Sequence, residues 1–168
     1  MASTLKNAAR VEGAWELVSF ILYAGESLTP IATPLGEKPL GRIMFLPSGY
    51  MSCTLTNPDA AKPIQAPQWA VASDDEIVSI SRAMTTYCGH FRTFEENGDL
   101  MLATKVDIAL DPNWIGSVQT RKVILHEAQG TRFMTLKPVQ ALLLPNGMKA
   151  TGVLLWKQIE DKKLVASL

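Results

Sequence analysis

The stretch from Tyr87 to Leu125, YCGHFRTFEENGDLMLATKVDIALDPNWIGSVQTRKVIL, decides the fold. It predicts three consecutive β-strands, because two turn sequences interrupt otherwise strand-forming runs. The first turn, Glu95 to Asp99, contains an Asn-Gly pair that favours a tight hairpin, and the second runs from Asp111 to Gly116.

The third of these strands brings two strongly polar side chains to an apolar side. The two-residue period of a strand places Gln119 and Arg121 with Val123 and Leu125. An arginine on such a side requires either a partner inside the core or a ligand, and the pattern leaves both readings open.

The rest of the chain adds more strands and little helix. On the first expected strand, Val11 to Tyr23, the period places Trp15, Leu17, Ser19 and Ile21 on one side. The other expected strands are a hairpin over Gly41 to Leu55 that turns at Pro47-Ser48-Gly49, and the segments Phe133 to Lys137 and Thr151 to Ile159.

One short amphipathic helix is expected from Ser73 to about Met84. Ser73 and Glu76 have the spacing of a capping box, and Ile77, Ile80 and Met84 follow at helical spacing as a stripe that packs on the sheet. Residues 2–10 are small and polar and are compatible with a helical turn that borders the fold.

These elements predict an all-β fold: a single domain over residues 1–168, with an eight-stranded antiparallel barrel over about 11–159. Closure removes the unpaired edges of such a meander, and eight strands leave an interior that holds one small ligand.

Composition narrows the function classes. Sixteen basic and sixteen acidic residues give no net charge, which argues against a nucleic-acid partner. Cys53 and Cys88 lack metal-binding spacing, two histidines are too few for a cluster, and no motif for a cofactor is visible. Neither a signal sequence nor an 18-residue apolar run is present, so a cytoplasmic protein without a membrane partner is expected.

Several short motifs follow one another in a set order: Gly13-Ala14-Trp15, Gly41-Arg42-Ile43, Ser48 to Ser52, Tyr87 to Phe91, Pro112 to Gly116, Gln119-Thr120-Arg121 and Leu155-Trp156. In this order they resemble the stand-alone lipocalin-like domains of bacteria and fungi. Two positions depart from the pattern. Thr104-Lys105 stands where relatives often carry a histidine, and Lys157-Gln158 where they commonly carry an arginine that stacks on the first-strand tryptophan.

The resemblance implies a calyx around a small, mostly apolar molecule. Fungal domains similar to this one occur among secondary-metabolite enzymes, where some are thought to guide cyclisation or isomerisation without a cofactor. Fold alone does not establish function.

Three side chains are the candidate catalytic residues: Arg121 to stabilise developing negative charge, Gln119 to orient a carbonyl, and Tyr87 to donate a proton, with Arg121 expected to favour its phenolate. Each also has a structural reading: Arg121 bonded to backbone carbonyls or to an acid such as Asp107, Gln119 in a hydrogen bond across the barrel, and Tyr87 as a core residue. The candidate substrate-binding residues are Tyr50, Phe91, Thr104, Asn113 and Trp114.

The remaining polar strand residues are expected on the outer face. His90 shares a side with Cys88, and Lys105 and Asp107 are expected as an outward ion pair. If that register were inverted, Lys105 and Asp107 would instead form an acid and base pair in the cavity.

Two functions follow from these observations. The first is a cofactor-free isomerase or cyclase for a polyketide- or terpenoid-like molecule, and the second is a non-catalytic carrier of a small hydrophobic ligand. We favour the enzyme, because a carrier of apolar ligands has less use for two polar side chains on one inward face.

Overall fold

A computed structural model describes residues 10–25, 27 and 29–160 of the chain. The strands are β1 (Gly13–Ala24), β2 (Pro30–Ala32), β3 (Leu40–Phe45), β4 (Tyr50–Thr56), β5 (Met84–Glu96), β6 (Asp99–Ala109), β7 (Val118–Ala128), β8 (Thr131–Pro138), β9 (Leu142–Leu143) and β10 (Lys149–Gln158). The helical segments are η1 (Pro58–Ala61), η2 (Trp69–Val71), α2 (Asp74–Arg82) and η3 (Pro112–Trp114). The expected turn at residues 2–10 lies almost wholly outside the described residues.

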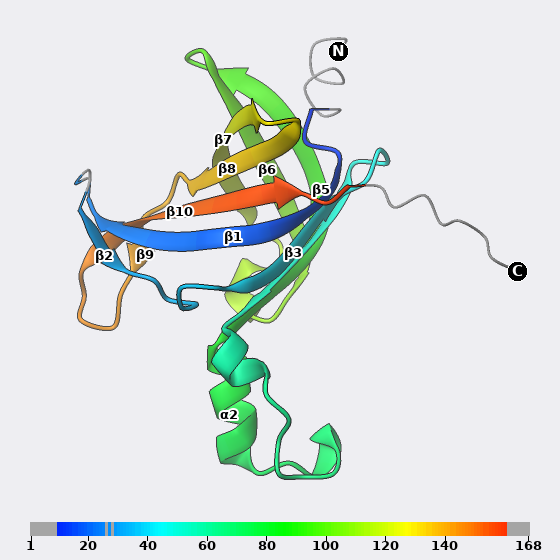
Figure 1. Cartoon of the computed structure of the whole chain (residues 1–168), viewed down its shortest axis with the longest axis vertical. Helices are drawn as coiled ribbons and strands as arrows, with labels where there is room; N and C mark the ends of the chain where they lie inside the picture. Colours follow the sequence, from blue (N-terminus) through cyan, green and yellow to red (C-terminus); the bar gives the residue numbers. More distant parts are fainter. Residues whose placement is uncertain (1–9, 26, 28, 161–168) are drawn as a thin grey trace, which may run out of the picture.

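The strands close into an antiparallel eight-stranded barrel, so the predicted all-β class and closure are confirmed. The order β1-β3-β4-β5-β6-β7-β8-β10 returns to β1 through the β1–β10 pairing (Figure 1). β2 and β9 are two short additions in segments expected to be loops. No helix of the described residues is long and apolar enough to cross a membrane.

The predicted turns have the backbone that their sequences favour. Asn97 and Gly98 both adopt positive φ between β5 and β6, and Gly49 does so between β3 and β4. Gly89 is needed for a different reason: a Cβ at this position would lie 1.9 Å from the backbone oxygen of Lys105. Glycine therefore lets β5 and β6 approach beside an irregularity in their pairing.

A second irregularity changes which face of β1 points inward. The register with β10 shifts between Leu17 and Ser19, so Trp15 and Leu17 face the interior but are followed there by Phe20 and Leu22. The prediction that Ser19 and Ile21 share the side of Trp15 is therefore wrong. A β-bulge inserts one extra residue, and the two-residue period restarts on the opposite face.

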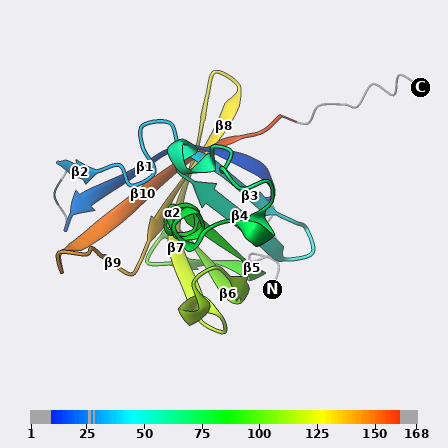
Figure 2. The same ribbon diagram turned by 90° about the horizontal axis from the view of Figure 1, so that it is seen from below.

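The helix α2 begins as predicted but does not contribute to the core. The side chain of Ser73 accepts from the Glu76 backbone N–H, and the Glu76 side chain accepts from the Ser73 N–H, which completes the capping box. However, α2 buries no residue, and it contacts β5 and η1 as it projects from the barrel end where β4 stops (Figures 1 and 2). The expected packing of Ile77 and Ile80 as core residues is wrong.

Candidate functional site

One end of the barrel interior holds a cavity of about 290 Å³, just below the roughly 300–1,000 Å³ typical of ligand pockets. Most of its lining is apolar: Phe20, Leu22, Pro34, Ile43, Leu55, Leu136, Pro138, Leu142, Leu143, Leu144, Leu154 and Trp156. The other lining residues are Cys53, Thr85, Tyr87, Trp114 and Arg121. A mostly apolar hollow with a few convergent polar groups fits a small hydrophobic ligand.

Arg121 brings the positive charge of this cavity. It reaches the wall from β7, where it lies opposite Leu102 of β6 and Pro138 of β8. One guanidinium nitrogen, Nη1, donates to the backbone oxygen of Thr120 at 3.2 Å, and Arg121 forms no ion pair with the described residues. A guanidinium has five N–H donors, so the hydrogen bond to Thr120 and the contact with the Tyr87 hydroxyl leave donors for a ligand.

Tyr87 lies beside Arg121 and is 8% exposed. Burial raises the pKa of its phenol, the negative charge that Cys53 would carry adds to this effect, and Arg121 opposes it without reversing it. Arg121 favours the phenolate, as expected, but its effect on the pKa is smaller than that of burial. Tyr87 is a neutral hydrogen-bond donor in the folded protein, because desolvation outweighs the nearby cation.

Cys53, on β4 directly opposite Tyr87 of β5, is a second neutral group in the wall. Burial raises the pKa of its thiol to about 12, although Arg121 and the hydrogen bond with Tyr87 lower it. The thiol therefore does not act as a nucleophile at neutral pH.

Trp114 connects the two polar groups at the edge of the cavity. Its ring lies edge-on to the Tyr87 ring, with the two centroids 5.3 Å apart, and the Arg121 guanidinium carbon is 6.0 Å from the Trp114 ring centroid. Trp114 lies in η3, between β6 and β7, where Asp111 caps the turn by accepting from the Asn113 backbone N–H at 2.9 Å. Arg121, Tyr87 and Trp114 thus form one cluster that the sequence had placed among the candidates.

Three other candidates lie away from this cluster. Gln119 lies at the start of β7, and its amide donates to the Ser117 hydroxyl at 3.0 Å. Thr104 is buried opposite Gln119, and Phe91 packs edge-on against Phe45 in the core, with centroids 5.0 Å apart. None of Gln119, Thr104 and Phe91 is among the described residues that line the cavity.

Tyr50 and Asn113 are also outside the cavity lining. Asn113 is exposed on η3. Tyr50 lies on the outer face of β4, where its hydroxyl donates to the Cys88 sulfur at 3.4 Å and its ring meets His90 edge-on. The hydrogen bond with Cys88, with desolvation and Asp107, raises the pKa of Tyr50 to about 12.

The polar strand residues that were expected on the outer face lie there. His90 is exposed, and its Nδ1 lies 3.5 Å from a carboxylate oxygen of Asp107. Lys105 is exposed too, and its Nζ donates to the Gly116 backbone oxygen at 2.6 Å. The outward register is confirmed, while Asp107 pairs with His90 and not with Lys105.

The sequence reasoning missed Trp156 as a cavity residue. It was noted as part of a closing motif, but it is 1% exposed and lines the cavity from β10. Its indole Nε1 has no hydrogen-bond partner among the described residues. Alternation along β10 places Trp156 inward, but an unpartnered N–H cannot be read from periodicity.

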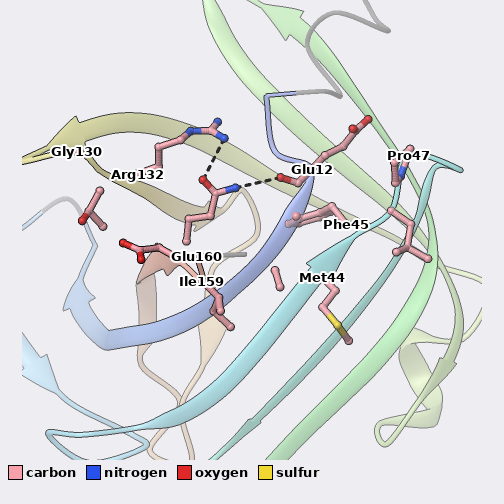
Figure 3. A pocket seen from close by; sticks show the side chains of 13 residues that line it. Glu12, Met44, Phe45, Pro47, Gly130, Arg132, Ile159 and Glu160 are labelled. Atoms are coloured by element: carbon pink, nitrogen blue, oxygen red, sulfur yellow. Dashed lines mark hydrogen bonds between the residues drawn. The ribbon is translucent and has the colours of Figure 1, made fainter. Parts of the chain in front are cut away.

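A second pocket, of about 590 Å³, lies at the opposite end of the barrel. Arg132 and Glu12 are part of its wall, and Gln158 links them: it accepts from Arg132 at 3.2 Å and donates to the Glu12 backbone oxygen at 3.5 Å (Figure 3). The Arg132 guanidinium carbon lies 5.5 Å from the Trp15 ring centroid. Relatives commonly place an arginine on Trp15 from the last strand, where this chain has Lys157-Gln158. Here Arg132 of β8 supplies that cation.

Comparison with known proteins agrees with this architecture. A search of curated proteins found no match. The family model of the lipocalin-like domain matches residues 12–159, from the start of β1 to the end of β10. The chain belongs to the lipocalin-like domain family.

Proposed function

We propose that the cavity binds a small, mostly apolar metabolite through an acidic or enolic oxygen, and that the protein is a cofactor-free isomerase or cyclase for this molecule. The observation that carries the proposal is the Arg121 guanidinium, which lines an otherwise apolar cavity without an ion-pair partner among the described residues. A charge in such a site interacts strongly with a ligand anion, because little water screens it.

The two polar groups have complementary roles in this mechanism. Arg121 would stabilise the negative oxygen of an enolate or phenolate. Tyr87 would donate its phenol proton to the enolate and recover a proton from water, since its raised pKa keeps it protonated at neutral pH. The apolar walls would hold a polyketide- or terpenoid-like skeleton in a reactive conformation.

The alternative is a carrier that binds the same class of molecule without changing it. One observation favours it: the described residues that line the cavity include no carboxylate and no imidazole. His90 and Asp107 lie on the outer face, so the described part of the cavity wall offers an acid and a cation but no general base. An enzyme built this way would act on substrates that ionise without a protein base.

Substitution of Arg121 tests the shared part of both readings. We expect Arg121→Met to fold and to bind a neutral apolar dye like the wild type, but to bind naphthalene-2-carboxylate about ten- to hundredfold more weakly, because a charge-assisted hydrogen bond is lost. Isothermal titration calorimetry measures both affinities. Arg42→Met is the matched control, since Arg42 is an exposed arginine on β3 that is not part of the cavity wall.

Turnover separates the enzyme from the carrier. Native mass spectrometry of the purified wild type identifies any molecule that copurifies, and that molecule then serves as substrate. In an enzyme, Arg121→Met should lower the rate by about 10² to 10³, more than it lowers binding. Unchanged naphthoate affinity in Arg121→Met would show that the guanidinium is structural.

A further inference from the structure

Trp156 presents a buried hydrogen-bond donor that no described residue satisfies. The indole is 1% exposed and Nε1 has no partner among the described residues. Buried indole N–H groups usually find an acceptor, and a donor left without one costs free energy comparable to a lost hydrogen bond. This donor therefore calls for an acceptor that the described residues do not supply.

The other fully buried tryptophan shows what a satisfied indole looks like in this fold. Trp15 is also buried, but its Nε1 donates to the Val11 backbone oxygen at 2.9 Å. Trp156 lacks such an arrangement because its cross-strand neighbours, Leu17 of β1 and Met134 of β8, offer apolar side chains. Trp156 lines the cavity, but Nε1 itself is almost fully covered, so an acceptor in the cavity reaches it only when binding shifts the indole or its neighbours.

We infer that Trp156 Nε1 is a second polar anchor for the ligand, and that the ligand is an apolar molecule with two separate oxygen functions. An acidic or enolic oxygen would lie at Arg121 and Tyr87, and a neutral acceptor, such as a ketone, would accept from Trp156. The inference rests on the proposed function and narrows its ligand class. A molecule with one oxygen would leave one of the two donor sites empty.

Water is the competing acceptor for this donor. A buried water generally requires two to four polar partners, and the other described lining residues near Trp156 in sequence and pairing are apolar: Leu154 on β10 and Leu136 on β8. A ketone needs only the single N–H and brings its own apolar skeleton to fill the remaining space. The ligand is therefore the better partner.

Matched probes test the second anchor separately from the first. The parent probe is naphthalene-2-carboxylate, and its partners are the 5-, 6- and 7-acetyl derivatives, which place one ketone at different distances from the carboxylate. We expect at least one acetyl isomer to bind the wild type about three- to tenfold more tightly than the parent. Trp156→Phe should abolish this gain, so that the favoured acetyl isomer and the parent bind the variant with affinities within about twofold of each other.

A measurement on the unaltered protein covers the case in which Trp156→Phe does not fold. In ¹⁵N-labelled wild type, the assigned Trp156 indole N–H resonance should shift downfield and exchange more slowly when the favoured acetyl isomer is added. The parent should leave its exchange rate unchanged. The Trp15 indole, bonded to the Val11 oxygen, serves as the internal control.

Each result has one meaning. No gain from any acetyl group in the wild type, or a gain that persists in Trp156→Phe, overturns the second anchor. If the parent binds with Arg121-dependent affinity in that case, the proposed function survives alone. If the parent does not bind at all, the proposed function and the inference that rests on it both fail.

Discussion

The two ends of the barrel interior use similar residues to opposite effect. One end of the interior is filled by Trp15 and is the closed end, although a pocket lies outside it. There Trp15 donates to Val11 and lies under the Arg132 guanidinium, which is bonded to Gln158 and to the Arg10 backbone oxygen. At the cavity end, Arg121 and Trp114 also lie near each other, but both line an open cavity. An aromatic ring and an arginine stabilise the fold at one end and provide a binding site at the other.

The difference lies in how many donors the protein itself satisfies. Among the described residues, Arg132 donates to two acceptors at the closed end, the Gln158 side chain and the Arg10 backbone oxygen. Arg121 donates to the Thr120 backbone oxygen and lies beside the Tyr87 hydroxyl, and Trp156 Nε1 has no partner. Substitutions at the closed end should therefore lower stability, while those at the cavity end should mainly lower ligand affinity. Four predictions test this contrast.

The largest effect is expected for Trp15→Ala. Removing a fully buried indole leaves a large void and one unsatisfied carbonyl, so the free energy of unfolding should fall by about 3–5 kcal/mol. Urea unfolding followed by circular dichroism measures this change. A variant that melts within a couple of degrees of the wild type would show that Trp15 does not anchor the closed end.

Arg132→Met should have the next largest effect. It removes the cation over Trp15 and two hydrogen bonds, and should cost about 1–3 kcal/mol of stability. Arg42→Met is the control, because its exposed pair with Glu16, at 3.8 Å, should contribute less than about 1 kcal/mol. Equal losses of unfolding free energy in the two variants would show that Arg132 stabilises the fold no more than an exposed arginine does.

The pH dependence of stability reports on the neutral thiol in the cavity wall. The folded pKa of Cys53, about 12, lies above its ordinary value of 9.0. The contribution of the neutral thiol to the free energy of unfolding is therefore fully present below about pH 9. It is lost as the pH rises toward 12, with a slope of up to about 1.4 kcal/mol per pH unit.

Cys53→Val keeps an apolar side chain of similar size and removes this titration. Its unfolding free energy should fall less steeply than that of the wild type between pH 9 and 10.5, as measured by urea unfolding. The slope should not vanish, since the pKa of Tyr87 is raised as well. Parallel curves would show that the Cys53 thiol ionises as readily in the folded chain as in the unfolded one.

The smallest effect on stability is expected for Tyr87→Phe. The ring keeps its edge-on contact with Trp114, so the unfolding free energy should change by less than about 1 kcal/mol. The affinity for naphthalene-2-carboxylate should nevertheless fall about two- to tenfold, because one donor is lost. A large loss of stability with unchanged affinity would place Tyr87 with the closed-end residues.

Much of the fold could be predicted because its signals are local. The Asn97-Gly98 turn, the Gly49 turn and the Ser73–Glu76 capping box depend on a few neighbouring residues, and each has the expected geometry. The alternation that placed Arg121 inward is equally local, and Arg121 lines the cavity. Ile77 and Ile80 had the right local pattern too, but the loop carries α2 beyond the barrel end, where no core is available.

The sequence alone determined the strands, most turns, the helix start and the family, because backbone preference and side-chain alternation act over two to four residues. The tertiary structure decided the face of β1 after Leu17, the protonation of Tyr87, the source of the cation on Trp15 and the unpartnered Trp156 N–H. These properties depend on bulges, desolvation and contacts between residues distant in the chain, which exist only once the barrel has closed.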